Sequence, residues 1–404
     1  ASDLPAELLN FRALPPLTTF ATTEPTMSSQ YPAVDPQGLL EYSVVFTDRS
    51  LNHMSLQFQQ VMRDISAGLK RTYNASAVAV VPGGGTYGME AVARQFGNGK
   101  KCMVLRNGWF SYRWSQIFEA GRIPAEEIVL KARPVAPGVQ QPWTPAPLEE
   151  VLASIGQHKP DLVFAPHVET SSGIILPDAY LRAVADAVHA HGGLFVLDCI
   201  ASGAIWVDMQ TCAIDILISA PQKGWSASPC SALVMLGEQA AARIKETRSS
   251  SFACDLLKWL QIMQAYENGG HAYHATLPTD SLARFCQSMQ ETQSLGLEDL
   301  KARQWELGRR VRTLMAASGF PSVAAAGFEA PGVVVSYTDD LLIHNGKKFI
   351  EQGLQTAAGV PLMCDEPADF RTFRIGLFGL DKWLNPDQTV QNLELALRTA
   401  SPSN

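Results

Sequence analysis

Seven short apolar segments alternate with segments of helical spacing over the first two thirds of the chain. They lie at residues 77–81, 101–105, 128–130, 162–165, 194–197, 214–218 and 232–236. Apolar strands separated by amphipathic helices are typical of a mostly parallel sheet that is covered on both faces. The sequence therefore predicts an α/β fold with a mostly parallel seven-stranded sheet.

The rest of the chain suggests a division into three parts. Residues 1–35 are rich in Pro, Thr and Ser and predict an extended arm, and residues 36–295 are expected to form the large domain. Residues 296–404 are expected to form a smaller C-terminal α+β domain. Helices are predicted over 51–73, 281–318, 347–358 and 388–399, and further strands over 333–337 and 372–375.

Charge and cysteine content exclude several classes of function. The net charge of −7 argues against a nucleic-acid partner or an anionic membrane surface. The 7 cysteines include no CxxC pair, which disfavours a zinc site, and their scatter does not suggest a disulfide framework. No apolar run is long enough to span a bilayer and no signal peptide is evident, so we expect a cytoplasmic protein without metal.

Lys223 follows the strongly apolar segment 214–218, in a turn of small residues. Burial lowers the pKa of a lysine amine, and a neutral amine condenses with aldehydes. Asp198 ends the preceding predicted strand. A carboxylate and a lysine at neighbouring strand ends suit pyridoxal phosphate, since the lysine forms a Schiff base and the carboxylate keeps the pyridine nitrogen protonated. A surface lysine in a strand-to-helix loop is the alternative.

Further motifs follow other predicted strands. Gly83-Gly84-Gly85-Thr86 could cradle an anion at a helix start, and Trp109 or Phe110 could stack on a flat ring. The hydroxyls in 167–173 could bind a ligand oxygen, and Arg374 in an apolar strand could clamp a carboxylate. A packing turn, a core aromatic, a capped turn and a structural salt bridge are the respective alternatives. Strand ends in such sheets line one crevice, so these groups are expected to converge.

On these motifs the chain resembles the class V aminotransferase family of fold-type I pyridoxal phosphate enzymes, and it is most similar to the alanine–glyoxylate and serine–glyoxylate branch. The resemblance implies a homodimer with two shared active sites. It also implies ping-pong transfer of an amino group from a small amino acid to a small 2-oxo acid such as glyoxylate or pyruvate.

The resemblance further implies roles for individual residues. Lys223 and Asp198 correspond to the catalytic pair, and Arg374 to the group that binds the substrate carboxylate. The implied cofactor-binding residues are Gly84, Gly85, Thr86, Phe110, Thr170 or Ser171, Asp198, Ser202, Gln222, Lys223 and, from across the dimer interface, Tyr273 and Thr276.

The chain departs from the family pattern at residues 22–29, where a Gly-Pro-rich substrate loop is usual, and at Gly84, where Ser is frequent. Three alternatives stay open. A lyase or cysteine desulfurase would use a cysteine such as Cys364, although desulfurases carry a His where Gln222 stands. An aminophosphonate transaminase would use Arg374 equally well, and a regulatory or scaffold protein would need no electron sink.

Overall fold

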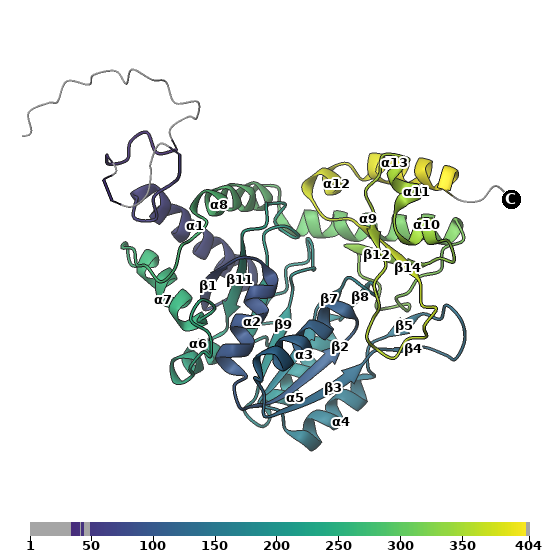
Figure 1. Ribbon diagram of the computed structural model, residues 1–404, viewed down its shortest axis with the longest axis horizontal. Coiled ribbons are helices and arrows are strands. Elements are labelled where there is room, and N and C mark those ends of the chain that lie inside the picture. The colour runs from purple at the N-terminus through teal and green to yellow at the C-terminus, as the bar shows by residue number, and fades with distance from the viewer. Residues whose placement is uncertain (1–33, 41, 44–48, 401–404) are drawn as a thin grey trace, which may run out of the picture.

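A computed structural model describes residues 34–400, except 41 and 44–48 (Figure 1). Almost all of the expected N-terminal arm, including the divergent segment 22–29, lies outside the described residues.

All seven predicted strands belong to one seven-stranded sheet, with the order β1-β11-β10-β9-β6-β2-β3. Neighbours from β10 to β3 run parallel, whereas β11 is antiparallel to both β1 and β10. The strands are β1 (Ala77–Pro82), β2 (Lys101–Arg106), β3 (Glu126–Lys131), β6 (Leu162–Pro166), β9 (Leu194–Asp198), β10 (Ile216–Ser219) and β11 (Ser231–Leu236). Every residue of β6, β9, β10 and β11 is buried, so the mostly parallel, two-sided sheet is confirmed.

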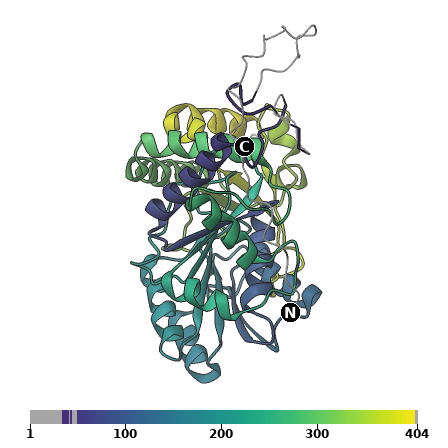
Figure 2. The same cartoon turned by 90° about the vertical axis from the view of Figure 1, so that its left-hand side faces the viewer.

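Helices flank both sides of this sheet (Figure 2). Helices α2 and α3 pack side by side, as do α4 and α5, while α1 and α7 pack on β1 and α8 packs on α1. Their bounds are α1 (Leu56–Tyr73), α2 (Gly85–Phe96), α3 (Trp109–Gly121), α4 (Leu148–His158), α5 (Asp178–His189), α6 (Glu238–Arg243), η1 (Ile244–Glu246), α7 (Leu256–Glu267) and α8 (Thr279–Ser294). The helix predicted from residue 51 begins at Leu56, because the side chain of Ser55 accepts the Phe58 N–H and caps it.

The C-terminal part joins helices to a three-stranded sheet of order β12-β14-β13. Its elements are α9 (Leu297–Ala317), β12 (Val333–Tyr337), α10 (Leu341–His344), α11 (Lys347–Ile350), β13 (Ala357–Ala358), β14 (Thr372–Gly376), α12 (Leu380–Leu384) and α13 (Pro386–Ala400). The two predicted strands are confirmed.

Two helix predictions need correction. The long zone 281–318 is two helices, α8 and α9, separated at Gly296, whose φ of 87° is incompatible with a continuous helix. The predicted helix 347–358 stops at Ile350. Gly353 turns the chain there with a φ of 77°, and Ala357 and Ala358 pair with β14 instead.

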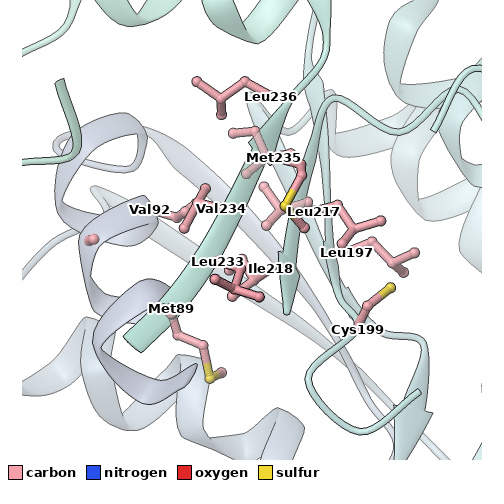
Figure 3. Close-up of a cluster of buried hydrophobic side chains, with 14 of the residues drawn as sticks. Met89, Val92, Leu197, Cys199, Leu217, Ile218, Leu233, Val234, Met235 and Leu236 are labelled. Carbon is pink, nitrogen blue, oxygen red and sulfur yellow. The ribbon is translucent and has the colours of Figure 1, made fainter. Parts of the chain in front are cut away.

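The main core cluster takes all its members from residues 51–289, whereas a second cluster runs from Leu300 to Leu397 with Ala204 added. In the main core, Met89 and Val92 of α2 lie beside Leu233 and Val234 of β11 (Figure 3). A third cluster, which includes Trp143 and Ile174 from the first part and Val323 and Val335 from the second, packs the two parts against each other. The first two cores support our proposal that residues 36–295 and 296–404 form separate domains, and the third cluster lies at their contact. Two short ribbons, β4 (Arg133–Pro134) with β5 (Trp143–Thr144) and β7 (Val168–Glu169) with β8 (Ile174–Ile175), complete the fold. Over the described ranges, no helix is both long and apolar enough to cross a membrane.

Candidate active site

A cavity of about 440 Å³ lies where the carboxyl ends of the parallel strands meet β12, β13 and β14. The predicted site residues that line it are Gly85, Thr86, Phe110, Thr170, Asp198, Gln222, Lys223 and Arg374. A larger cavity of about 770 Å³ lies elsewhere, beside α9 and α13, and none of the predicted residues lines it. The convergence expected from the strand ends therefore holds for these eight residues.

Asp198 ends β9, which runs parallel to β10 and pairs its last residue with Ile218. Its side chain is only 7% exposed, and its Oδ1 accepts a 2.9 Å hydrogen bond from the Ile200 N–H. Burial raises the pKa of this carboxyl to about 7, and the negative charge of Glu169 adds to the effect, while the Ile200 bond and the positive charge of Arg113 oppose it. A cationic ligand group in the cavity would favour the ionised form.

Lys223 lies in the turn that follows β10, and its Nζ is 4.8 Å from the centre of the Phe378 ring. Burial lowers the pKa of this amine, and repulsion by the Arg374 guanidinium lowers it further. No carboxylate in the described part of the chain forms an ion pair with it. A partly buried amine with a lowered pKa is suited to covalent chemistry with an aldehyde.

The glycine turn after β1 leads directly into α2. Gly83 has a φ of 116°, which side chains rarely adopt, and Gly84 caps the helix without any side-chain bond to its first turn. A Cβ on Gly85 would lie 2.5 Å from the side chain of Ile200, so a residue larger than glycine does not fit here unless Ile200 shifts. Nearby, Oε1 of Gln222 is buried and has no hydrogen-bond partner among the described residues. Uncapped helix N–H groups suit an anion such as phosphate, whereas the unpaired amide oxygen of Gln222 is an acceptor and needs a donor.

Phe110 enters the cavity from the first turn of α3, which a buried carboxylate holds in place. Glu169 accepts hydrogen bonds from the N–H groups of Phe110 (3.2 Å) and Ser111 (2.8 Å) and from the hydroxyls of Ser111 and Ser171 (both 2.7 Å). A carboxylate at a helix N-terminus offsets the helix dipole. Sequence reasoning missed Glu169, because its partner helix begins about sixty residues earlier in the chain.

The hydroxyl residues separate into two groups. Thr170 lines the cavity, whereas Ser171 is fully buried and its hydroxyl is used by Glu169 and by the Trp109 N–H. Ser202 does not line the cavity either, and its Oγ is 2.7 Å from Nδ1 of His167. Of Thr170 and Ser171, which were proposed for one role, the geometry favours Thr170.

Two guanidinium groups flank Phe110. The Cζ of Arg374, on β14, is 5.6 Å from the ring centre, and the Cζ of Arg113, on α3, is 5.3 Å away. The Nε of Arg374 donates to the Ala358 carbonyl, and neither arginine forms an ion pair with a carboxylate of the described residues. Burial lowers the pKa of Arg374. Arg113 was missed from the sequence, although its position three residues after Phe110 places it on the same helix face.

Gly84, Tyr273 and Thr276 do not line the cavity within one chain. Tyr273 is 66% exposed, and its hydroxyl is 3.4 Å from that of Thr276. Both lie on the segment between α7 and α8.

Cys364, the candidate sulfur nucleophile, is buried outside the cavity lining. Its Sγ donates to the Arg106 carbonyl at 3.3 Å, and burial raises the pKa of its thiol to about 12. A thiol held in this way is a poor nucleophile at neutral pH, because the thiolate is the reactive form.

The family model, a curated relative and a solved structure that resemble this chain are all aminotransferases. The Aminotransferase class-V family matches residues 35–355. The soluble hydrogenase small subunit of Synechococcus sp. is 29% identical over 70% of this chain and 71% of that protein. The alanine–glyoxylate aminotransferase of Felis catus is 28% identical over 87% of this chain and 83% of that protein. A crystal structure of alanine–glyoxylate aminotransferase from Nostoc sp. superposes with a TM-score of 0.73, at 19% identity, over 86% of this chain and 89% of that one.

Proposed function

Since this chain belongs to the class-V aminotransferase family of pyridoxal phosphate-dependent transaminases, we propose that it moves the amino group of a small amino acid, of the alanine or serine type, to a small 2-oxo acid such as glyoxylate or pyruvate. The observation that carries this proposal is the convergence of Lys223, Asp198 and Arg374 on one cavity. An amine, a carboxylate and a guanidinium are the groups that a transaminase needs for the aldehyde, the ring nitrogen and the substrate carboxylate.

The cavity fits pyridoxal phosphate on its own chemistry. The uncapped start of α2 would hold the phosphate, with the side-chain NH2 of Gln222 as a further donor, and Phe110 would stack on the ring. Thr170 would reach the ring hydroxyl, and Asp198 would accept a hydrogen bond from the protonated ring nitrogen. The volume of about 440 Å³ lies within the range of small-molecule sites.

Lys223, Arg374 and Asp198 each have a separate role in the proposed reaction. Pyridoxal phosphate, when bound, supplies an aldehyde that carries the amino group and a ring that accepts electron density. Lys223 would hold that aldehyde, and its Nζ, when free, would accept the proton of the substrate α-carbon. Arg374 fixes the substrate carboxylate, and Asp198 keeps the ring nitrogen protonated. The first product leaves before the second substrate binds, so the kinetics are ping-pong.

The same proposal includes a homodimer in the cytoplasm. Tyr273 and Thr276 are surface residues that do not line the cavity of their own chain, although family members send the corresponding residues to a partner's phosphate site. A symmetric dimer in which each chain lends this pair to the other would account for their exposure.

The visible absorbance of the purified protein tests the proposed function. We expect a cofactor band that bleaches on adding L-alanine or L-serine, with release of a 2-oxo acid, and that returns with glyoxylate or pyruvate. Lys223→Ala should abolish turnover, whereas Lys245→Ala, which removes an exposed lysine, should not.

Other outcomes point to the competing functions. Release of sulfide or ammonia while the band persists would indicate a lyase. The buried, hydrogen-bonded thiol of Cys364 argues against a lyase that uses this cysteine. Bleaching by 2-aminoethylphosphonate alone would indicate an aminophosphonate transaminase. A protein with no band after addition of pyridoxal phosphate would contradict the role of Lys223.

A further inference from the structure

We propose that Arg113 is a direct ligand of the cofactor's phosphate group and supplies its principal positive charge. No family pattern used above assigns this residue. The inference rests on the proposed function, since it names a further contact in the same site.

The position of the guanidinium carries the inference. Arg113 lies one turn beyond Phe110 on α3, and it lines the cavity. Its Nη1 donates a 2.9 Å hydrogen bond to Oγ1 of Thr86, the second residue of α2. The side chain therefore spans from α3 to the uncapped N-terminus of α2, where the geometry favours an anion.

The charges in the cavity point the same way. Three cationic side chains line it, namely Lys223, Arg374 and Arg113, against the single carboxylate of Asp198. In the proposed mechanism Lys223 is used by the aldehyde and Arg374 by the substrate carboxylate, which leaves Arg113. A phosphate monoester carries a charge of about −1.5 to −2, and a helix N-terminus supplies only about +0.5. A guanidinium beside that helix start provides the remaining counter-charge and a bidentate donor.

Two other roles are possible for a guanidinium here, and they predict different losses. One is to bind the second carboxylate of a dicarboxylic substrate, and the other is to support the Phe110 ring, whose centre is 5.3 Å from the Arg113 Cζ. The contact with Thr86 favours the phosphate-binding role, because it places the Arg113 guanidinium beside the glycine turn. The substrate carboxylate is instead expected beside Arg374, which lies on β14.

The test compares two aldehydes that differ only in the phosphate. Full-length protein freed of cofactor is titrated with pyridoxal phosphate and with pyridoxal, and the dissociation constants are compared for wild type, Arg113→Gln and Arg113→Lys. We expect Arg113→Gln to weaken pyridoxal phosphate binding roughly 10- to 100-fold, as for loss of a charge-assisted bond, with little change for pyridoxal. Arg113→Lys should keep part of the affinity, and inorganic phosphate should compete less well in Arg113→Gln than in wild type.

A control variant and three contrary results separate the possible roles of Arg113. Arg309→Gln removes an exposed arginine of α9 and should change neither constant. Equal weakening of both aldehydes in Arg113→Gln would mean that Arg113 only supports Phe110. Unchanged pyridoxal phosphate binding, with a raised KM for L-aspartate but not for L-alanine, would make it a substrate-carboxylate residue. Failure of the wild-type protein to bind pyridoxal phosphate would instead refute the proposed function itself.

Discussion

Replacing Asp198 with Asn should stabilise the cofactor-free protein at neutral pH while weakening its hold on the cofactor. The carboxyl is buried, and its pKa rises from 3.8 to about 7 on folding. Asn has nearly the same shape, and its side-chain oxygen can still accept the Ile200 N–H that Asp198 binds at 2.9 Å. The substitution therefore removes the cost of a buried charge and little else.

The sign and size of the effect follow from proton linkage. Between pH 3.8 and about 7 the folded chain keeps a proton on Asp198 that the unfolded chain has released. The free energy of unfolding therefore falls as pH rises through this window, by about 1.4 kcal/mol per pH unit, and is then level. Asp198→Asn lacks this loss, so its advantage should reach about 4 kcal/mol at pH 8 and only about 2 kcal/mol at pH 5.

Urea unfolding of the cofactor-free proteins at pH 5 and pH 8, at one protein concentration, measures both values. Asp369→Asn, which neutralises an exposed acid, is the matched control and should show no such pH-dependent gain. Added pyridoxal phosphate should stabilise the wild type more than Asp198→Asn, because only the carboxylate pairs with a protonated ring. An advantage of equal size at both pH values, or none at pH 8, would refute the assignment of the raised pKa to this carboxyl.

Three further predictions follow from the geometry. Arg374→Gln should raise the KM for amino donors roughly 10- to 100-fold with a smaller effect on kcat, because the guanidinium forms no ion pair with a carboxylate of the described chain. Steady-state kinetics measure this, and an unchanged KM would contradict it. The hydrogen bond that Nε2 of His189 donates to the Asp215 carboxylate raises the pKa of His189. Its stabilisation should therefore be complete below about pH 6.5 and be lost as pH rises through the folded pKa. His189→Gln should flatten the free energies of unfolding measured between pH 6 and 9, and parallel profiles would contradict this. Tyr273→Phe should speed loss of cofactor on dialysis without changing the dimer detected by light scattering, and an active monomer would refute the shared site.

The parts of the site that could be predicted from the sequence are those fixed by strand ends. Asp198 and Lys223 both follow buried apolar strands, and parallel neighbours bring their carboxyl ends to one edge regardless of the intervening loops. The same reasoning placed Thr86 and Phe110. Arg374 was predicted because a charged residue stands within an apolar strand, a pattern that can be seen in the local sequence alone.

The missed features depend on contacts between distant segments. Glu169 acts on a helix start that precedes it by about sixty residues, so nothing in its own motif distinguishes it from a surface acid. The choice between Thr170 and Ser171 depends on which side chain turns toward Glu169. The end of α11 depends on strand pairing of Ala357 and Ala358 with β14, since the apolar spacing of that segment alone suits a helix.

The shifted pKa values at the site share one cause and indicate what the cavity binds. Burial moves Asp198, Lys223 and Arg374 each toward the uncharged form. The charges of Arg113 near Asp198 and of Glu169 near Arg374 offset this only in part, so a counter-charge on a bound ligand would further favour the charged forms of these two groups. A ligand with a protonated ring nitrogen would relieve Asp198, and one with a carboxylate would relieve Arg374. Lys223 differs, because a covalent bond to an aldehyde removes the need for a counter-charge altogether. A passive binding site would gain nothing from a destabilised amine, and this difference argues that the cavity is built for catalysis rather than for storage of a cofactor.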